Sequence, residues 1–224
     1  MFELLKAPRE LIRAIGECLG SEADINSLVQ ASTTKHSLLN DHLYRHNAQR
    51  SAGCALRWAA RAGIKSTAQI ALRNGPNVNA VGKGITSTAL VLAAAEGHAD
   101  IVKLLLCQQD VDVNARSCGG LTALHMAAWH GHPEVSTDFG IDINSRDLKF
   151  GGTALFWAAH EVNLDSVHLF LIREDVDVNV AIEDGWTPLI TAARFGHAPV
   201  INLLLACNNV DPNWTSQGGT TALV

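Results

Sequence analysis

Charged side chains are scarce in this sequence, and no long apolar stretch occurs in it. Asp, Glu, Lys and Arg make up 17% of the 224 residues, and the formal net charge is −5; an average soluble domain has roughly 25% charged residues. A protein that binds nucleic acid or an anionic membrane needs a basic stripe, so this charge balance argues against both partners. The longest apolar run, at 89–95, has seven residues, whereas a membrane-spanning helix needs about 18.

Signals for export and for disulfide bonding are also missing. The N-terminal segment has no basic region followed by a long apolar stretch, so it does not resemble a secretory signal. The five cysteines are odd in number and include no pair spaced C-x-x-C. We therefore expect an intracellular protein, cytoplasmic or nuclear, whose reduced cysteines pack as small apolar side chains.

Motifs for catalysis and for metal binding are missing as well. The sequence has no G-x-S-x-G nucleophile motif and no phosphate-binding P-loop. His42 and His46 have the i, i+4 spacing of zinc ligands, but no nearby cysteine pair completes a tetrahedral site. We therefore predict no catalytic, cofactor-binding or metal-binding residue, and no enzymatic activity.

An internal repeat is the main feature that the sequence does contain. The phrase Thr-Ala-Leu or Thr-Pro-Leu begins at residues 88, 122, 153, 187 and 221, at spacings of 34, 31, 34 and 34. Val-Asn or a variant of it recurs in step at 78, 113, 143, 178 and 212, and Gly-His recurs at 97, 131 and 196. A period near 33 with such phrases is the signature of ankyrin repeats, and residues 51–224 resemble an ankyrin-repeat array.

This resemblance implies an all-α fold, a solenoid of stacked helix pairs. The repeats span about 51–81, 82–116, 117–146, 147–181 and 182–215, and a sixth begins at 216 and stops at 224. Thr88 is placed to cap the first helix of its repeat, and Gly97 suits the left-handed conformation that ends it. Ala93 and Ala94 lie on one helical face and allow neighbouring helices to approach closely. Because one unit cannot bury its apolar face alone, stacking must supply the core.

Histidines and aspartates recur at fixed positions of the repeat, which indicates structural roles. His98, His132 and His197 share one position, where we expect a ring nitrogen to bond to backbone between two helices. His125 is expected to bond near the start of its helix. The aspartates of the repeated Asp-Val-Asn turns are expected to serve turn formation.

The repeat at 117–146 is shorter than the others. From His132 to Asn144 there are 12 positions, whereas the stretches from His98 and His197 to the matching asparagines span 16. The four missing residues, about one helical turn, predict a stunted second helix and a local bend, unless the gene model has lost an exon edge. The chain also stops within a repeat, so it is either a fragment or ends in an incompletely folded repeat.

The first 50 residues lack the repeat and predict three short helices. The first begins at Pro8 and carries an apolar stripe. The segment resembles an F-box, whose usual start is L-P-x-E-[LI]-[LI]-x-x-I. The resemblance implies that this module binds the adaptor of an SCF-type ubiquitin ligase through Pro8, Leu11, Ile12, Ile15, Leu19 and Leu28. The alternative is a helical cap that only covers the apolar face of the first repeat.

In ankyrin arrays the partner usually binds the concave face, made of the first helices and the loop tips. By position, the candidate partner-binding residues of this chain are Arg61, Lys83, Glu96, Trp129, His130, Phe150, His160, Trp186, Arg194 and Phe195. Trp129, Trp186 and Phe195 lead because aromatic residues dominate binding hot spots. The alternative for Trp186 is packing on the neighbouring loop, and Trp58 and Trp157 are expected to pack within their helices.

The sequence therefore favours a monomeric interaction protein with protein partners, and neither nucleic acid nor membrane as partner. The leading hypothesis is a substrate-recognition subunit of an SCF-type ubiquitin ligase, which raises the concentration of a target near the ligase. A plain ankyrin scaffold is the second hypothesis. The third is an enzyme or accessory biosynthetic protein that reuses the fold, with a site in the shortened repeat near His125, His130 and His132.

Removal of residues 1–46 is predicted to lower the melting temperature of the array. The apolar face around Leu56 and Ala59 would lose its cover, whether or not an adaptor binds. Thermal unfolding of the full and the truncated chain measures the effect, and an unchanged melting temperature would count against close docking of the N-terminal helices.

Overall fold

The computed structural model describes residues 53–82, 87–135 and 142–223. The predictions for the N-terminal module, from Pro8 to Leu28, and for Lys83 lie outside these residues. The described residues form helices and no strands, so the all-α prediction is confirmed. None of the described helices is long and apolar enough to cross a bilayer.

The chain divides into two compact units. Unit 1 comprises Met1–Leu92 and Asp100–Val111, and unit 2 comprises Ala93–Ala99 and Asp112–Val224. The helices are α4 (Cys54–Ala62), α5 (Lys65–Arg73), α6 (Ala89–Ala95), α7 (Ala99–Leu106), α8 (Ala123–His130), α9 (Ala154–His160), α10 (Leu164–Leu171), α11 (Pro188–Arg194) and α12 (Ala198–Leu205), with a 3-10 helix η1 (Pro133–Val135).

In unit 1, α4 packs against α5, and the loop after them is held by hydrogen bonds. The buried Arg57 side chain donates from Nε to the Ser87 carbonyl at 3.1 Å. Asn79 donates from Nδ2 to the Asp110 carbonyl at 2.6 Å. Both bonds span about one repeat along the chain.

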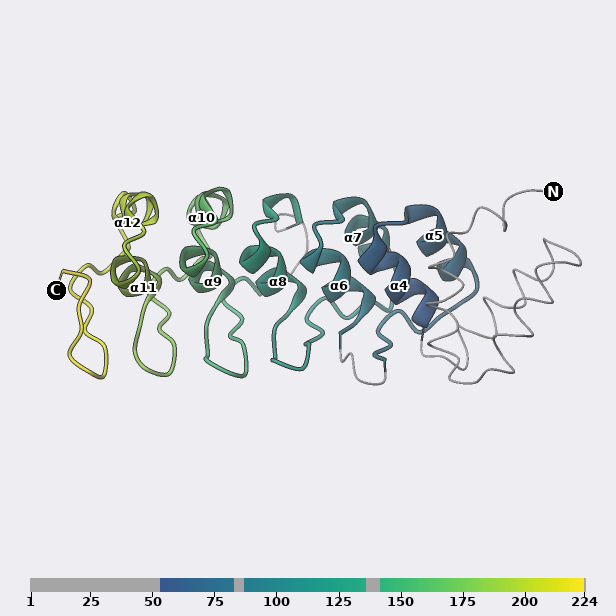
Figure 1. Cartoon of the computed structure of the whole chain (residues 1–224), viewed down its shortest axis with the longest axis horizontal. Helices are drawn as coiled ribbons and strands as arrows, with labels where there is room; N and C mark the ends of the chain where they lie inside the picture. Colours follow the sequence, from purple (N-terminus) through teal and green to yellow (C-terminus); the bar gives the residue numbers. More distant parts are fainter. Residues whose placement is uncertain (1–52, 83–86, 136–141, 224) are drawn as a thin grey trace, which may run out of the picture. The chain divides into compact units, whose positions relative to one another are not determined.

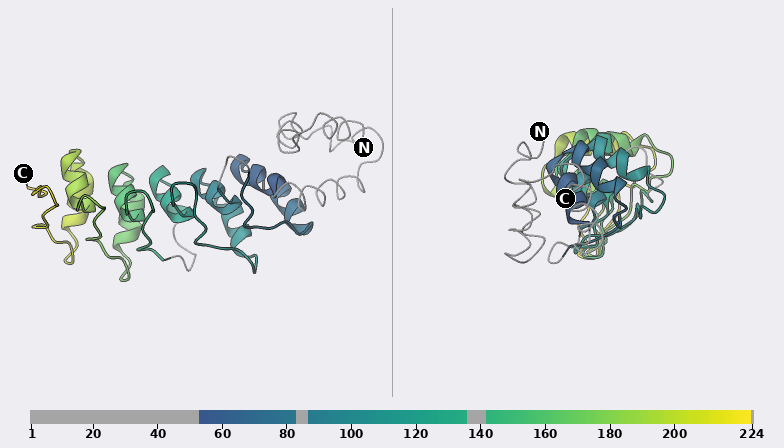
Figure 2. Two further views of the ribbon diagram at one scale, coloured as in Figure 1. Left: turned by 90° about the horizontal axis from the view of Figure 1, so that it is seen from below. Right: turned by 90° about the vertical axis from the view of Figure 1, so that its right-hand side faces the viewer.

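Unit 2 has two layers of helices. The inner helices α8, α9 and α11 pack side by side in that order, α10 packs on α9, and α12 packs on α11 and α10 (Figure 1). The loops that precede α9 and α11 extend on the side away from α10 and α12 (Figures 1 and 2). Each repeat thus adds one helix to each layer and one loop to the same edge.

Alanine at the contact surfaces explains the close approach of the inner helices. Ala128, Ala158, Ala159 and Ala192 are completely buried, whereas Ala193 is half-buried. Larger side chains fill the space between the layers, and Phe170 of α10 is among the most buried of them. The core of unit 2 is therefore formed between repeats, because a single helix pair leaves one face open.

The predicted end signals of the helices are confirmed. The side-chain oxygens of Thr153 and Thr187 accept hydrogen bonds from backbone N–H groups three residues later, at 3.3 Å. Gly97 has a φ of +71°, the left-handed conformation that terminates the first helix of a repeat. His197 donates from Nε2 to the His160 carbonyl at 3.1 Å, so this histidine links its own repeat to the end of the preceding inner helix.

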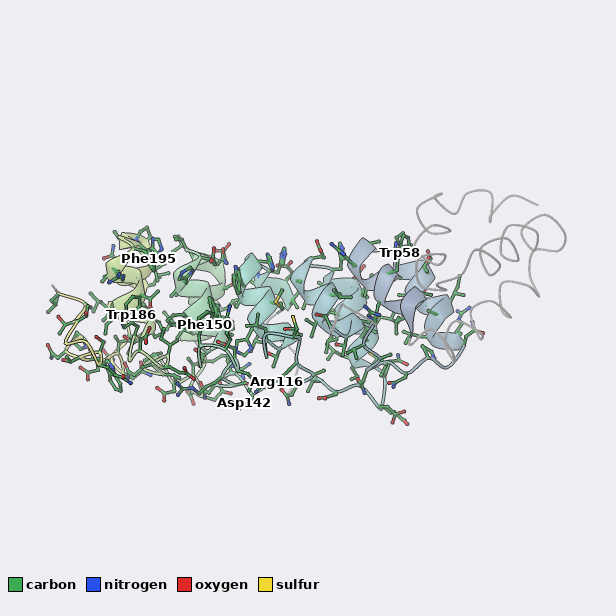
Figure 3. The ribbon with its side chains drawn as sticks, turned by 60° about the horizontal axis from the view of Figure 1, so that its bottom comes forward. Trp58, Arg116, Asp142, Phe150, Trp186 and Phe195 are labelled. Atoms are coloured by element: carbon green, nitrogen blue, oxygen red, sulfur yellow. The ribbon has the colours of Figure 1, made fainter. Side chains whose placement is uncertain are left out.

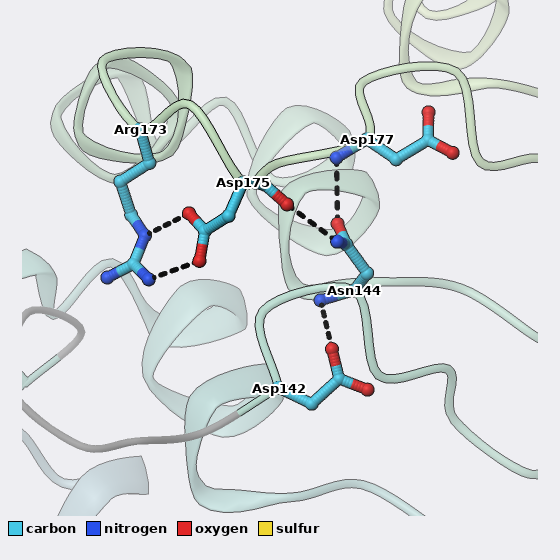
Figure 4. Close-up of polar contacts among 5 residues, drawn as sticks. All are labelled: Asp142, Asn144, Arg173, Asp175 and Asp177. Carbon is cyan, nitrogen blue, oxygen red and sulfur yellow. Dashed lines mark hydrogen bonds and ion pairs between the residues drawn. The ribbon is translucent and has the colours of Figure 1, made fainter.

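The asparagines of two Asp-x-Asn turns in unit 2 clamp one repeat to the next. Asn144 donates to the Asp175 carbonyl at 2.7 Å and accepts from the Asp177 N–H at 2.8 Å (Figure 4). Its own N–H donates to the Asp142 side chain at 3.0 Å, which fixes the turn. Asn179 repeats the first two contacts with residues 209 and 211. The recurring phrase therefore builds a hydrogen-bonded edge, as predicted for turn chemistry.

The second helix of the shortened repeat is reduced in its described part to η1, a single 3-10 turn. Val135 of this turn is buried and corresponds by position to the buried Ile101 of α7. Both α8 and α10 pack against η1. Residues 136–141 lie outside the described part of the chain, so the stunted helix and the bend both stay predictions.

Val162 occupies the position that glycine holds in the other repeats. Its φ is +61°, close to the +73° of Gly131 and the +72° of Gly196. A β-branched residue in this left-handed conformation costs roughly 1–2 kcal/mol. The Val162 side chain is 37% exposed, so burial recovers little of this cost.

Replacement of Val162 by glycine is predicted to stabilise the protein by about 0.5–1 kcal/mol. The relieved backbone strain exceeds the roughly 0.5–1 kcal/mol of conformational entropy that glycine loses on folding. Thermal or urea unfolding measures the difference. The matched reverse change, Gly196→Val, is predicted to destabilise through backbone strain alone, because a Cβ atom there meets nothing within 4 Å. Lower stability of the Val162→Gly variant would mean that packing of the valine outweighs its strain.

Candidate partner-binding surface

The positions that follow the Ala-Ala pair lie at the ends of the inner helices of unit 2. Trp129, His160 and Arg194 take the first of these positions, and His130, Glu161 and Phe195 take the second. Because the alanines hold α8, α9 and α11 side by side, equivalent side chains recur along one face. Arg194 and Phe195 are exposed on it, and Trp129 and His160 are half-buried.

Three of these side chains form a contiguous group with two further rings, and we call this group the ring cluster: Trp129, Phe150, Trp157, His160 and Phe195. The indoles of Trp129 and Trp157 stack with centroids 4.5 Å apart and planes at 6°. The His160 ring meets Trp157 edge-on at 5.8 Å and Phe195 edge-on at 5.1 Å. The cluster therefore joins side chains from three consecutive repeats of unit 2.

The centre of the ring cluster is buried and its rim is exposed. Trp157 is 6% exposed, whereas Phe150 is 41% and Phe195 is 51% exposed. Phe150 reaches the cluster from the loop before α9 and lies 5.8 Å from Trp157. Figure 3 shows Phe150, Trp186 and Phe195 along the part of unit 2 formed by α9 and α11. Buried aromatic centres with exposed rings around them are typical of binding hot spots.

Asp147 fixes both Trp157 and the loop that carries Phe150. Its buried carboxylate accepts hydrogen bonds at 2.8 Å from the backbone N–H groups of Lys149, Phe150 and Gly152. It also accepts one from Trp157 Nε1 at 3.1 Å. Four charge-assisted hydrogen bonds hold the loop and the indole in one arrangement, so the ring cluster is built in advance of any partner.

Two cations lie over ring faces beside the cluster. The guanidinium of Arg194 is 4.5 Å from the centroid of Trp186, and Lys149 Nζ is 4.7 Å from that of Phe150. Trp186 is half-buried beneath Arg194. Contact of Trp186 with a partner and packing of Trp186 on the neighbouring loop both stay predictions.

The other predicted residues lie apart from these contacts or at their edge. His130 is exposed, with its ring 6.4 Å from Trp129 and 6.5 Å from His132. Arg61 is exposed in the last turn of α4 in unit 1, and Glu96 is exposed directly after α6.

The sequence indicated Trp157 only as a packing residue and did not single out Asp147. Trp157 packs as expected, but it packs beneath the exposed rings of the cluster. Met126 and Thr191 occupy the same repeat position, directly before the Ala-Ala pair. This position could have indicated from the sequence that Trp157 lies on the inner face. The available signal for Asp147 was its position before a Gly-Gly loop. Because a carboxylate in a loop is usually exposed, its burial could not be predicted from the sequence.

His125, within the shortened repeat, has a structural role. Its Nε2 lies 3.1 Å from the Gly152 carbonyl and so must donate, while Nδ1 lies 2.8 Å from Thr122 Oγ1 and 3.2 Å from the Thr122 nitrogen. Burial lowers the pKa of His125 below its ordinary value of 6.5, although the Gly152 bond and the Asp147 charge oppose this shift. Both ring nitrogens are occupied by the protein. Within the described residues, no group of three His, Cys, Asp or Glu side chains is arranged to hold a metal ion.

Comparison with known proteins agrees with the architecture. The family model for ankyrin repeats matches residues 56–147 and 137–216. The match covers well over half of the chain, and the chain therefore belongs to the ankyrin-repeat family.

Several curated proteins are similar to this chain at moderate identity. The probable E3 ubiquitin-protein ligase XBOS33 of Oryza sativa subsp. japonica is 36% identical over 62% of this chain and 28% of its own length. The probable E3 ubiquitin-protein ligase XBOS32 of the same plant is 31% identical over 73% of this chain and 39% of its own length. The nuclear factor NF-kappa-B p105 subunit of Gallus gallus is 33% identical over 63% of this chain and 15% of its own length. The chain thus spans well under half of each relative.

The stabilising effect of His125 is predicted to fade as the pH falls below about 6.5. Because burial lowers its pKa in the folded state, the unfolded chain takes up the proton first, so the contribution is complete above 6.5 and is lost on acidification. At neutral pH, His125→Ala should cost about 1–3 kcal/mol through unsatisfied buried partners. Urea unfolding of both proteins between neutral and mildly acidic pH measures the difference. The exposed His168, changed to Gln, is the control, and a pH-independent cost of His125→Ala would contradict the prediction.

Proposed function

We propose that this protein is a substrate-recognition subunit of an SCF-type ubiquitin ligase. In this proposal the N-terminal module binds the ligase adaptor, and the ankyrin array holds the target protein. The chain itself carries out no covalent chemistry. It raises the effective concentration of the target near the ligase.

The ring cluster carries the target-binding half of the proposal. Trp129 and His160 belong to α8 and α9, Phe195 directly follows α11, and Asp147 fixes the buried Trp157 beneath them. A surface with its aromatic side chains already in place loses little conformational entropy on binding, which favours affinity. Membership of the ankyrin-repeat family supports a protein as the partner.

The ligase half of the proposal is supported by two observations of different kind. The first is the F-box-like pattern of residues 1–50, with Pro8, Leu11, Ile12 and Ile15 at positions of the motif. The second is the similarity to relatives named as E3 ubiquitin-protein ligases. The family match begins at residue 56, so it bears on the array and leaves the N-terminal module to direct experiment.

A plain ankyrin scaffold is the competing function. It is favoured by similarity to the p105 subunit, whose name refers to no ligase. In that case residues 1–50 serve only to cover the end of the array, and the ring cluster binds a partner without any link to ubiquitin. Adaptor binding separates the two functions.

The purified chain is predicted to retain the SCF adaptor protein in a pull-down, and the double variant Leu11→Asp, Ile15→Asp is predicted to lose it. Two carboxylates on the apolar stripe would have to be desolvated at the interface, which is expected to reduce binding by more than about tenfold. Arg13→Asp changes charge off that stripe and is the matched control. Equal melting temperatures of the three proteins would show that the array is intact.

Failure of the unmodified chain to retain the adaptor would contradict the ligase function and favour the scaffold. Retention by the double variant as well as by the unmodified chain would also contradict it, because the predicted stripe would then not be the contact surface.

A further inference from the structure

The polar groups around the ring cluster are mainly hydrogen-bond donors. The guanidinium of Arg194 and the ammonium of Lys149 are exposed and lie over ring faces. Among the described residues, neither forms an ion pair with a carboxylate. The Trp129 indole N–H likewise has no acceptor there, although its ring stacks on Trp157.

The carboxylates of the same helix ends and of the loop before α9 are already engaged. Glu161 Oε1 lies 2.8 Å from His160 Nδ1, and Glu134 lies 3.7 Å from His132 Nδ1. Asp147 is buried and accepts four N–H groups. Glu183 and Asp184 are exposed at the tip of the loop before α11, so free negative charge is present at that tip. The ring faces themselves carry the positive groups.

The two cation–ring pairs belong to consecutive repeats but to different positions of the repeat, since Lys149 lies in a loop and Arg194 lies in the last turn of α11. Lys149 and Phe150 belong to the loop before α9, and Trp186 ends the loop before α11. The two loops lie side by side, because the Glu183 N–H donates to the Phe150 carbonyl at 3.0 Å. A peptide that meets both cations therefore crosses two consecutive repeats, and an extended chain covers such a span with the fewest residues.

We propose that the ring cluster binds an extended peptide segment in which carboxylates alternate with large apolar side chains. Its carboxylates would meet Lys149 and Arg194, and its apolar side chains would cover Phe150, Trp129 and Phe195. This specificity deepens the proposed target-binding function and rests on it. Charge-assisted hydrogen bonds to arginine and lysine supply the discrimination, and the rings supply the buried area.

Fluorescence anisotropy with synthetic labelled peptides tests the proposal on the full chain. The probe repeats Asp-Leu-Phe over about twelve residues, and matched peptides carry Asn or Lys in place of Asp. At low salt the Asp peptide is expected to bind about tenfold more tightly than the Asn peptide, and the Lys peptide more weakly than both.

Two double variants locate the charge effect. Lys149→Glu with Arg194→Glu is expected to abolish the preference for the Asp peptide. Arg73→Glu with Lys103→Glu makes the same change in net charge at exposed positions of unit 1 and should leave the preference unchanged. An Asp preference that survives the first pair, or disappears with the second, would overturn the proposal.

A third variant, Phe195→Ala, tests the ring cluster itself. It is expected to weaken the Asp and the Asn peptide alike by about tenfold. Equal binding of these two peptides to the unmodified chain, both lost in Phe195→Ala, would overturn the charge preference and leave the ring cluster as a docking surface. Absence of binding by every peptide would overturn the inference as a whole, whereas the ligase function is decided by the adaptor pull-down.

Discussion

Close packing of the inner helices through alanine is the constraint on which the structure of unit 2 depends. Ala128, Ala158, Ala159 and Ala192 are completely buried where α8, α9 and α11 meet. A larger side chain at any of these positions would separate the helices and forfeit contacts on both sides. Because the helices lie close and in register, the residues that follow each pair are brought into contact across repeats.

Each repeat is joined to its neighbour at three levels in unit 2. The alanine contacts and the apolar side chains between the layers form the core. Asn144 and Asn179 clamp successive turns at one edge. The ring cluster joins the ends of the inner helices, where the residues that follow each Ala-Ala pair lie. A partner that covers the rings therefore contacts several repeats at once, which couples binding to the stability of the array.

Where the repeat phrases recur, prediction from the sequence succeeded. The threonine caps, the left-handed Gly97 and the turn function of the aspartates follow from one residue and its immediate neighbours, so a local pattern is sufficient to find them. Where a repeat departs from the pattern, the outcome depended on distant contacts. Val162 adopts the glycine conformation despite its β-branch, because Asn163 beside it donates to the Ala128 and Trp129 carbonyls and holds the turn in place.

The sequence by itself determined the all-α repeat architecture, the positions of the helix ends and the face on which aromatic residues would gather. Periodic phrases carry that information, since each acts within its own repeat. Only the tertiary structure decided that Trp157 is the buried centre of the ring cluster and that Asp147 fixes it. It also placed the guanidinium of Arg194 over the ring of Trp186. These relations join side chains of different elements, and their distances follow from how the helices and loops pack together.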